Sequence, residues 1–145
     1  MNYLLDSNIL LYAKMDAMPE HDVVARWLEG AVSDQNNTVN ICETSVLSFL
    51  RIATNPKVFN PTLPGSEAEK FIDSLFNCTN VNLLRASSAH FREVIRLMDK
   101  SRFYGNMVMD AHLAVLAMSI GATLVTRDSD FNKIPYLKTL NPLAK

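Results

Sequence analysis

Residues 108–128 of the chain read VMDAHLAVLAMSIGATLVTRD. The apolar run Val108–Ile120 predicts a helix that is buried over most of its surface. The run Thr123–Thr126 is rich in β-branched residues and predicts a short buried strand. Asp110 in the first turn of the helix and Asp128 just after the strand are therefore carboxylates beside a core. Burying such carboxylates costs free energy unless a positive charge lies beside them. Residues 108–128 are therefore a candidate functional site.

The rest of the chain repeats the pattern of strand, acid and helix. Tyr3–Leu5 predicts a strand that Asp6 follows, and Val39–Ile41 predicts a strand that Glu43 follows closely. We also expect strands over 81–84 and 138–140, and helices over 7–13, from Pro19 onward, over 44–54, 66–77 and 88–100. This alternation favours an α/β fold with a mainly parallel sheet of four to five strands covered on both faces. The length of 145 residues suits one domain, 1–145.

The acids Asp6, Glu43 and Asp128 all follow strands, and Asp110 begins a helix. Because right-handed crossovers bring the carboxyl ends of parallel strands to one edge, these four side chains are expected to meet there. A hard divalent cation such as Mg²⁺ is the partner that clustered carboxylates favour. Asn106 precedes the helix and is expected to be its cap, so capping does not require Asp110.

Each acid also has a structural interpretation. Asp6 could cap the helix that follows it, and Glu43 could favour a helix N-terminus through its charge. Asp128 and Asp130 could be ordinary turn acids. The three histidines, His21, His90 and His112, show no spacing typical of a metal site or a catalytic triad, so surface or packing roles are expected for them.

Composition limits the classes of partner. The net charge is −1, from 14 basic and 15 acidic residues. Five of the acidic residues are Asp6, Glu43, Asp110, Asp128 and Asp130. The rest of the chain therefore has 14 basic but only ten acidic residues. This balance suits a metal nuclease better than a non-specific nucleic-acid coat. No apolar run approaches the ~20 residues of a membrane span, and the start does not resemble a signal peptide. Two isolated cysteines favour a reducing compartment, so a cytoplasmic protein that does not contact membranes is expected.

Several basic residues have two interpretations. Arg92, Arg96, Lys100 and Arg102 follow helical spacing, and Arg51 ends the run Phe49-Leu50-Arg51. They could form a solvated face or contact phosphate or an acidic partner.

At these positions the chain resembles the PIN-domain ribonucleases, and within them the VapC toxins of bacterial toxin–antitoxin pairs. The matching segments are Leu5–Ala13, Phe49–Pro56, Gly105–Ala114, Gly121–Phe131 and Asn141–Leu143. Many PIN domains carry their second acid just before the position of Phe49, where this chain has Ser48. Glu43 lies five residues earlier, at the start of the expected helix.

The resemblance implies a three-layer α/β/α PIN fold and endoribonuclease activity that depends on Mg²⁺ or Mn²⁺, typically on tRNA or rRNA. It also implies a homodimer restrained by a VapB-like antitoxin. Asp6, Asp110 and Asp128 would be the metal ligands, and Glu43 would complete the catalytic set. Two alternatives stay open: a PIN-like binding module that acts only through a protein partner, and a housekeeping PIN nuclease.

Overall fold

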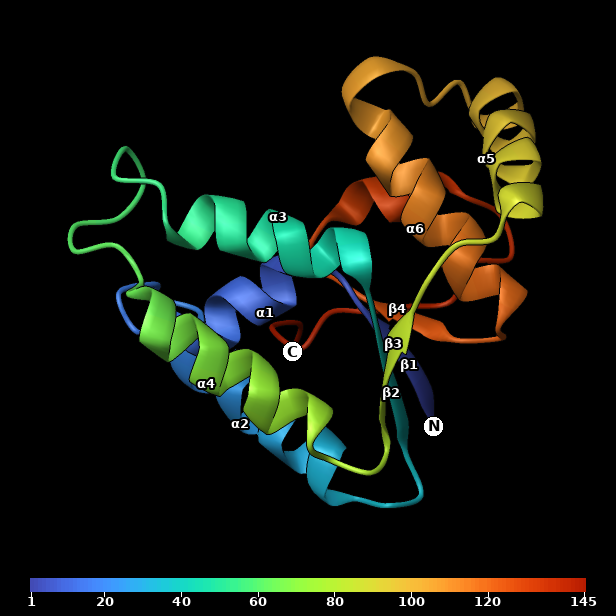
Figure 1. Cartoon of the computed structure of the whole chain (residues 1–145). Coiled ribbons are helices and arrows are strands. Elements are labelled where there is room, and N and C mark those ends of the chain that lie inside the picture. Colours follow the sequence, from blue (N-terminus) through green and yellow to red (C-terminus); the bar gives the residue numbers. More distant parts are fainter.

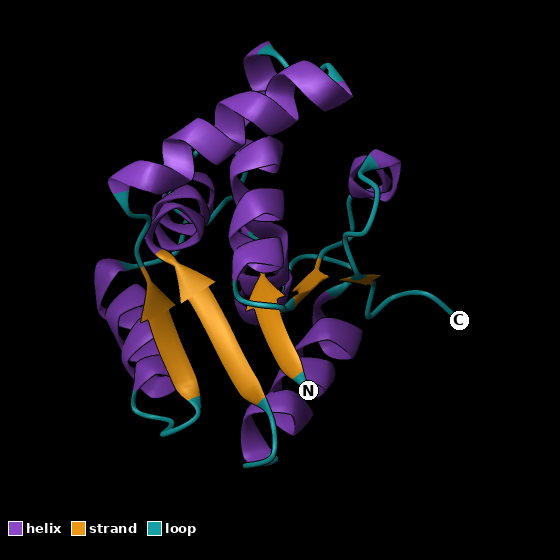
Figure 2. Cartoon of the chain, turned by 90° about the vertical axis from the view of Figure 1, so that its right-hand side faces the viewer, coloured by secondary structure: helices purple, strands orange, loops and turns teal.

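Five short strands form one parallel sheet in the order β3-β2-β1-β4-β5 (Figure 2). The computed structural model describes all residues, 1–145. In chain order the strands are β1 (Asn2–Leu5), β2 (Thr38–Cys42), β3 (Val81–Leu84), β4 (Thr123–Val125) and β5 (Thr139–Leu140). The predicted parallel sheet of four to five strands is therefore confirmed.

Helices cover both faces of this sheet (Figure 1). One side carries α1 (Ser7–Lys14), α2 (His21–Ser33), α3 (Glu43–Ala53) and α4 (Gly65–Phe76), and the other carries α5 (Ser88–Ser101) and α6 (Val108–Ser119). Short 3-10 helices span Gly105–Met107 and Ser129–Lys133. None of the helices has both the length and the apolar character that a bilayer crossing requires.

The alternation of side chains along β1 explains the layers. Tyr3 and Leu5 belong to a hydrophobic core that includes residues of α1 to α4. Leu4 points to the opposite face and packs into a second core with residues of α5 and α6. Two cores separated by one sheet confirm the α/β/α architecture.

The strand order places a topological switch beside β1. From β1 the chain adds β2 and then β3 on one side, and it later returns to add β4 and β5 on the other. The register pairs Leu5 with Val125, so the next residues, Asp6 and Thr126, leave neighbouring strands side by side. Parallel α/β sheets place their ligand clefts at such a switch, outside the carboxyl ends of the strands.

Several expected boundaries differ from the structure. The helix expected from Pro19 begins at His21, and the helix expected from residue 66 begins at Gly65. The prediction that Asn106 caps α6 is wrong, because Asn106 lies inside the Gly105–Met107 turn and α6 has no side-chain cap. The turn satisfies one of the N–H groups at the start of α6, since the backbone N–H of Val108 donates to the carbonyl of Gly105.

Candidate metal centre

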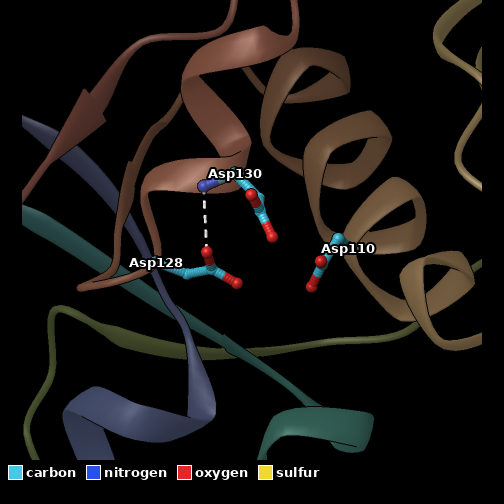
Figure 3. Close-up of side chains that lie close together, drawn as sticks. All are labelled: Asp110, Asp128 and Asp130. Atoms are coloured by element: carbon cyan, nitrogen blue, oxygen red, sulfur yellow. Dashed lines mark hydrogen bonds between the residues drawn. The ribbon is translucent and has the colours of Figure 1, made fainter.

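Three carboxylates meet outside the carboxyl end of β4 (Figure 3). Asp110 projects from the first turn of α6, while Asp128 and Asp130 come from the segment that follows β4. One oxygen from each of these residues lies within 4.8 Å of one from each of the others. Asp128 also begins the 3-10 helix, where its Oδ1 accepts a hydrogen bond from the backbone N–H of Asp130 at 2.9 Å. This bond fixes the direction of the Asp128 carboxylate.

Asp6 lies at the N-cap of α1 and is only 8% exposed. Its Oδ1 accepts from the backbone N–H of Ser7 at 2.7 Å, and its Oδ2 accepts from the hydroxyl of Thr126 at 2.7 Å. Asp6 therefore has the capping role that its sequence allowed, and it also lines the same cleft as Asp110. It does not belong to the group of three carboxylates that lie within 4.8 Å.

Thr126 joins the two sides of the site, a role that was not predicted. Besides donating to Asp6, its hydroxyl oxygen accepts from the backbone N–H of Asp128 at 3.0 Å. Thr126 is 3% exposed, so both bonds form away from bulk water. In the sequence, the only indication of this role is that Thr126 lies two residues before Asp128. That position becomes informative once the register of β1 and β4 is known.

Burial and mutual repulsion favour protonation of this group of acids. Burial, together with the charges of Asp128, Asp6 and Asp130, raises the pKa of Asp110 to about 6. Burial also raises the pKa of Asp6, although hydrogen bonds from Thr126 and Ser7 oppose the change. No Lys or Arg forms an ion pair with Asp6, Asp110 or Asp128, whereas Asp130 contacts Lys133 at 3.2 Å.

Glu43 lies apart from these acids. It begins α3, its side chain is 51% exposed, and its Oε1 pairs with Nε of Arg85 at 3.2 Å. It lines a separate, mainly apolar pocket of about 300 Å³, which Phe91 and His112 also border. The structure thus brings Asp6, Asp110 and Asp128 to one site, adds Asp130, and places Glu43 outside it.

The cleft that holds Asp6 and Asp110 has a volume of about 490 Å³. One wall comes from the start of α6 and the turn before it, and the opposite wall comes from α3. The α3 wall is largely polar and includes Thr44, Ser45, Ser48 and Arg51. The negatively charged floor of this cleft repels a polyanionic chain unless positive charge lies nearby.

Two histidines that are distant in the sequence form a hydrogen bond. Nε2 of His90 and Nδ1 of His112 are 2.7 Å apart, and Nε2 of His112 is 3.0 Å from the hydroxyl of Thr44. Burial lowers the pKa of both histidines, so they are neutral at pH 7. Their contacts tie α5 and α6 to α3, which agrees with the surface or packing roles expected for the histidines.

The sequence profile of the PIN domain family matches residues 3–136 of the chain. This chain belongs to the PIN domain family. Ribonuclease VapC37 of Mycobacterium tuberculosis is 30% identical over 141 residues, and the match covers 97% of each protein. Ribonuclease VapC33 of the same organism is 29% identical over 140 residues, again with 97% of each protein covered. The resemblance to VapC proteins is confirmed.

Solved structures of PIN domains share this fold. VapBC2 from Rickettsia felis, bound to a DNA fragment from its promoter, aligns with a TM-score of 0.69 and 23% identity, covering 97% of this chain and 98% of that one. VapC20 of Mycobacterium tuberculosis, described as a toxin that cleaves the sarcin-ricin loop, aligns with a TM-score of 0.70 and 10% identity, covering 94% and 97%.

The donor atoms of this PIN domain fit a divalent metal ion. The group offers only carboxylate oxygens, which are the ligands that hard cations such as Mg²⁺ and Mn²⁺ prefer. Burial and the neighbouring charges of Asp128, Asp6 and Asp130 raise the pKa of Asp110, and no Lys or Arg forms an ion pair with it. On α3, Ser48 lines the cleft, so the wall facing Asp6 and Asp110 offers a hydroxyl at this position.

Proposed function

We propose that this PIN domain is the toxin of a toxin–antitoxin pair and that it cleaves tRNA or rRNA with Mg²⁺ or Mn²⁺. The chain is an endoribonuclease, the class named for relatives that match over 97% of its length. The observation that supports the proposed chemistry best is the convergence of Asp110, Asp128 and Asp130 beside Asp6 at the switch between β1 and β4. We also propose that residues 1–145 act as one domain.

In this proposal Asp6, Asp110 and Asp128 hold the metal ion. A divalent ion at this place would stabilise charge on the phosphate and lower the pKa of a water molecule. The carboxylates give up any protons they hold when the ion binds, and Asp110 releases the proton that its raised pKa retains below about pH 6. Asp130, whose carboxylate lies within 4.8 Å of those of Asp110 and Asp128, would accept a proton from the attacking water as the oxygen of that water bonds to phosphorus. The bond from phosphorus to the leaving oxygen would then break, that oxygen would take up a proton from solvent water, and Asp130 would return its own proton to solvent.

Thr126 positions two of these acids, which leads to a prediction. Thr126→Val keeps the shape of the side chain but removes the hydroxyl that donates to Asp6 and accepts from the N–H of Asp128. We expect RNA cleavage to slow by about 10- to 100-fold, as is typical when a partner of a metal ligand is lost. Thr126→Ser keeps the hydroxyl and is expected to stay close to the wild-type rate. Equal rates for the valine and serine variants, both folded by circular dichroism, would contradict this role.

The toxin assignment includes a protein partner. The structure from Rickettsia felis and one titled as a toxin–antitoxin complex from Klebsiella pneumoniae are neighbours of this fold. On this basis we infer a VapB-like antitoxin for this chain. We also propose a homodimer, which the resemblance to VapC proteins implies. Phe91 and Ile95, one helical turn apart on α5 and 56% and 57% exposed, are candidates for its interface.

A cleavage assay tests the proposed chemistry. Protein stripped of metal and incubated with total tRNA or rRNA is expected to be inactive, to gain activity with Mg²⁺ or Mn²⁺, and to lose it again with excess chelator. Cleavage that persists in chelator would contradict the metal-dependent mechanism. No cleavage with either ion, in protein that is folded, would favour a binding module that acts through a protein partner.

A further inference from the structure

One face of α3 forms a polar wall of the cleft. Thr44, Ser48 and Arg51 line the cleft at positions i, i+4 and i+7, which lie along the same side of an α-helix. Asp6 and Asp110 line the same cleft. Arg51 is the only Lys, Arg or His among the residues that line it. A single positive charge therefore borders a cleft whose other charged residues are acids.

Arg51 has no partner within the protein. The four ion pairs of the chain join Arg85 to Glu43, Arg96 to Glu93, Arg127 to Glu20 and Lys133 to Asp130. Arg51 is exposed and donates no side-chain hydrogen bond, although two acids line the same cleft. Arg51 lies in the last turn of α3, where the helix dipole favours a positive charge. That interaction uses none of the five N–H donors of its guanidinium.

The residue at position 48, a serine, cannot form an ion pair with Arg51. Ser48 and Arg51 are three residues apart on α3, so their side chains are neighbours on the helix surface. A carboxylate at position 48 would be placed to form an ion pair with Arg51 across one turn. The hydroxyl of Ser48 leaves the guanidinium free, and it also offers a neutral donor to an anion in the cleft.

We propose that Arg51, with Ser48 beside it, binds an RNA phosphate next to the one that is cleaved. This inference rests on the proposed function and adds a substrate-binding residue to it. The carboxylates alone repel a nucleic-acid backbone, and a guanidinium on the opposite wall supplies attraction with the paired N–H geometry that matches phosphate oxygens. The contact is made to the backbone, so it holds the strand in place and does not read its sequence.

The first test measures binding without cleavage. In the Asp110→Asn background, with chelator present, a single-stranded RNA oligonucleotide is titrated at several salt concentrations. Adding Arg51→Ala is expected to weaken binding about tenfold, the typical effect of losing a hydrogen bond to a charged group. The slope of log affinity against log salt is expected to become shallower by about 0.7, because one fewer phosphate is neutralised.

Two matched variants separate this contact from a general loss of charge. Arg26→Ala removes an exposed arginine on α2 that lines none of the pockets described above, and it is expected to leave the salt slope unchanged. Arg51→Lys keeps the charge and loses the guanidinium fork, so it is expected to restore the slope while recovering only part of the affinity.

Kinetics give the second test. In protein that keeps Asp110, Arg51→Ala is expected to raise KM about tenfold with kcat nearly unchanged. The reason is that the contact is equally strong in the substrate complex and in the transition state. If folded Arg51→Ala keeps the wild-type salt slope and KM while the wild-type protein cleaves RNA, this inference is overturned and the proposed function stands. If the wild-type protein does not cleave RNA, the proposed function fails, and the binding titration still decides the role of Arg51.

Discussion

Asp110→Asn is expected to abolish RNA cleavage, with a loss of about a thousandfold or more. The amide keeps the size of the side chain but is a poor ligand for a hard cation. The several kcal/mol that a metal ion contributes to stabilising developing charge corresponds to a factor of this order. Single-turnover rates at saturating Mg²⁺ are the measurement that checks it. A folded variant with an unchanged rate would remove Asp110 from the proposed site.

The same variant is expected to be more stable than the wild type when metal is absent. The pKa of Asp110 in the folded protein is about 6, above the ordinary value of about 3.9 for aspartate. The folded state therefore binds more protons than the unfolded state between these values, and the stability of the wild type falls as pH rises from about 4 to about 6. In chelator, we expect Asp110→Asn to melt at a higher temperature at pH 7.5, and this advantage to shrink toward pH 4.

Glu43→Gln provides the matched control for this experiment. It also replaces an acid by its amide, but at a side chain that is half exposed and paired with Arg85 outside the metal group. We expect its cleavage rate to fall far less than that of Asp110→Asn or Asp6→Asn. A loss equal to that of Asp6→Asn would place Glu43 among the groups that act directly on the metal or the substrate.

Expression of the wild-type chain alone is expected to arrest bacterial growth, and expression with its VapB-like partner is expected to restore it. The physical reason is that an exposed cleft of about 490 Å³ lined by Asp6 and Asp110 is open to cellular RNA unless a partner covers it. An antitoxin Arg or Lys placed among the carboxylates could supply the charge that a metal ion otherwise provides. Growth curves and colony counts after induction are the measurement.

Asp6→Asn is the control for the growth experiment. Asparagine is as good a helix cap as aspartate, so this variant is expected to keep α1 in place while it loses the ligand. It should therefore accumulate as folded protein without arresting growth. If all three cultures grow equally at comparable levels of soluble protein, the toxin assignment is contradicted and a housekeeping nuclease or a binding module is favoured.

The parallel sheet and its acids could be predicted because both depend on local patterns. Buried strands were recognisable from short apolar runs, and acids that follow such strands share one edge by topology alone. The meeting of Asp110 with Asp128 needed no further information. The role of Thr126 could not be predicted in this way, because its bond to Asp6 depends on β1 and β4 being neighbours in a definite register.

The placement of Glu43 illustrates a second limit. Glu43 follows β2 as closely in sequence as the other acids follow their strands, but α3 starts at Glu43 itself and directs the side chain toward Arg85. The direction of a side chain at a helix start depends on the cap geometry, which the sequence did not define. The wrong prediction that Asn106 caps α6 has the same origin, because Asn106 lies inside a 3-10 turn that precedes the helix.

The bond between Thr126 and Asp6 spans 120 residues of chain. During synthesis, which proceeds from the N-terminus, Asp6 is made more than 100 residues before Asp110, Thr126 and Asp128. The sheet cannot place β4 beside β1 until that late segment has left the ribosome. The growing polypeptide consequently has no assembled centre until the segment through Asp128 has been made. The RNA cleavage proposed for this chain therefore cannot begin before that segment has left the ribosome.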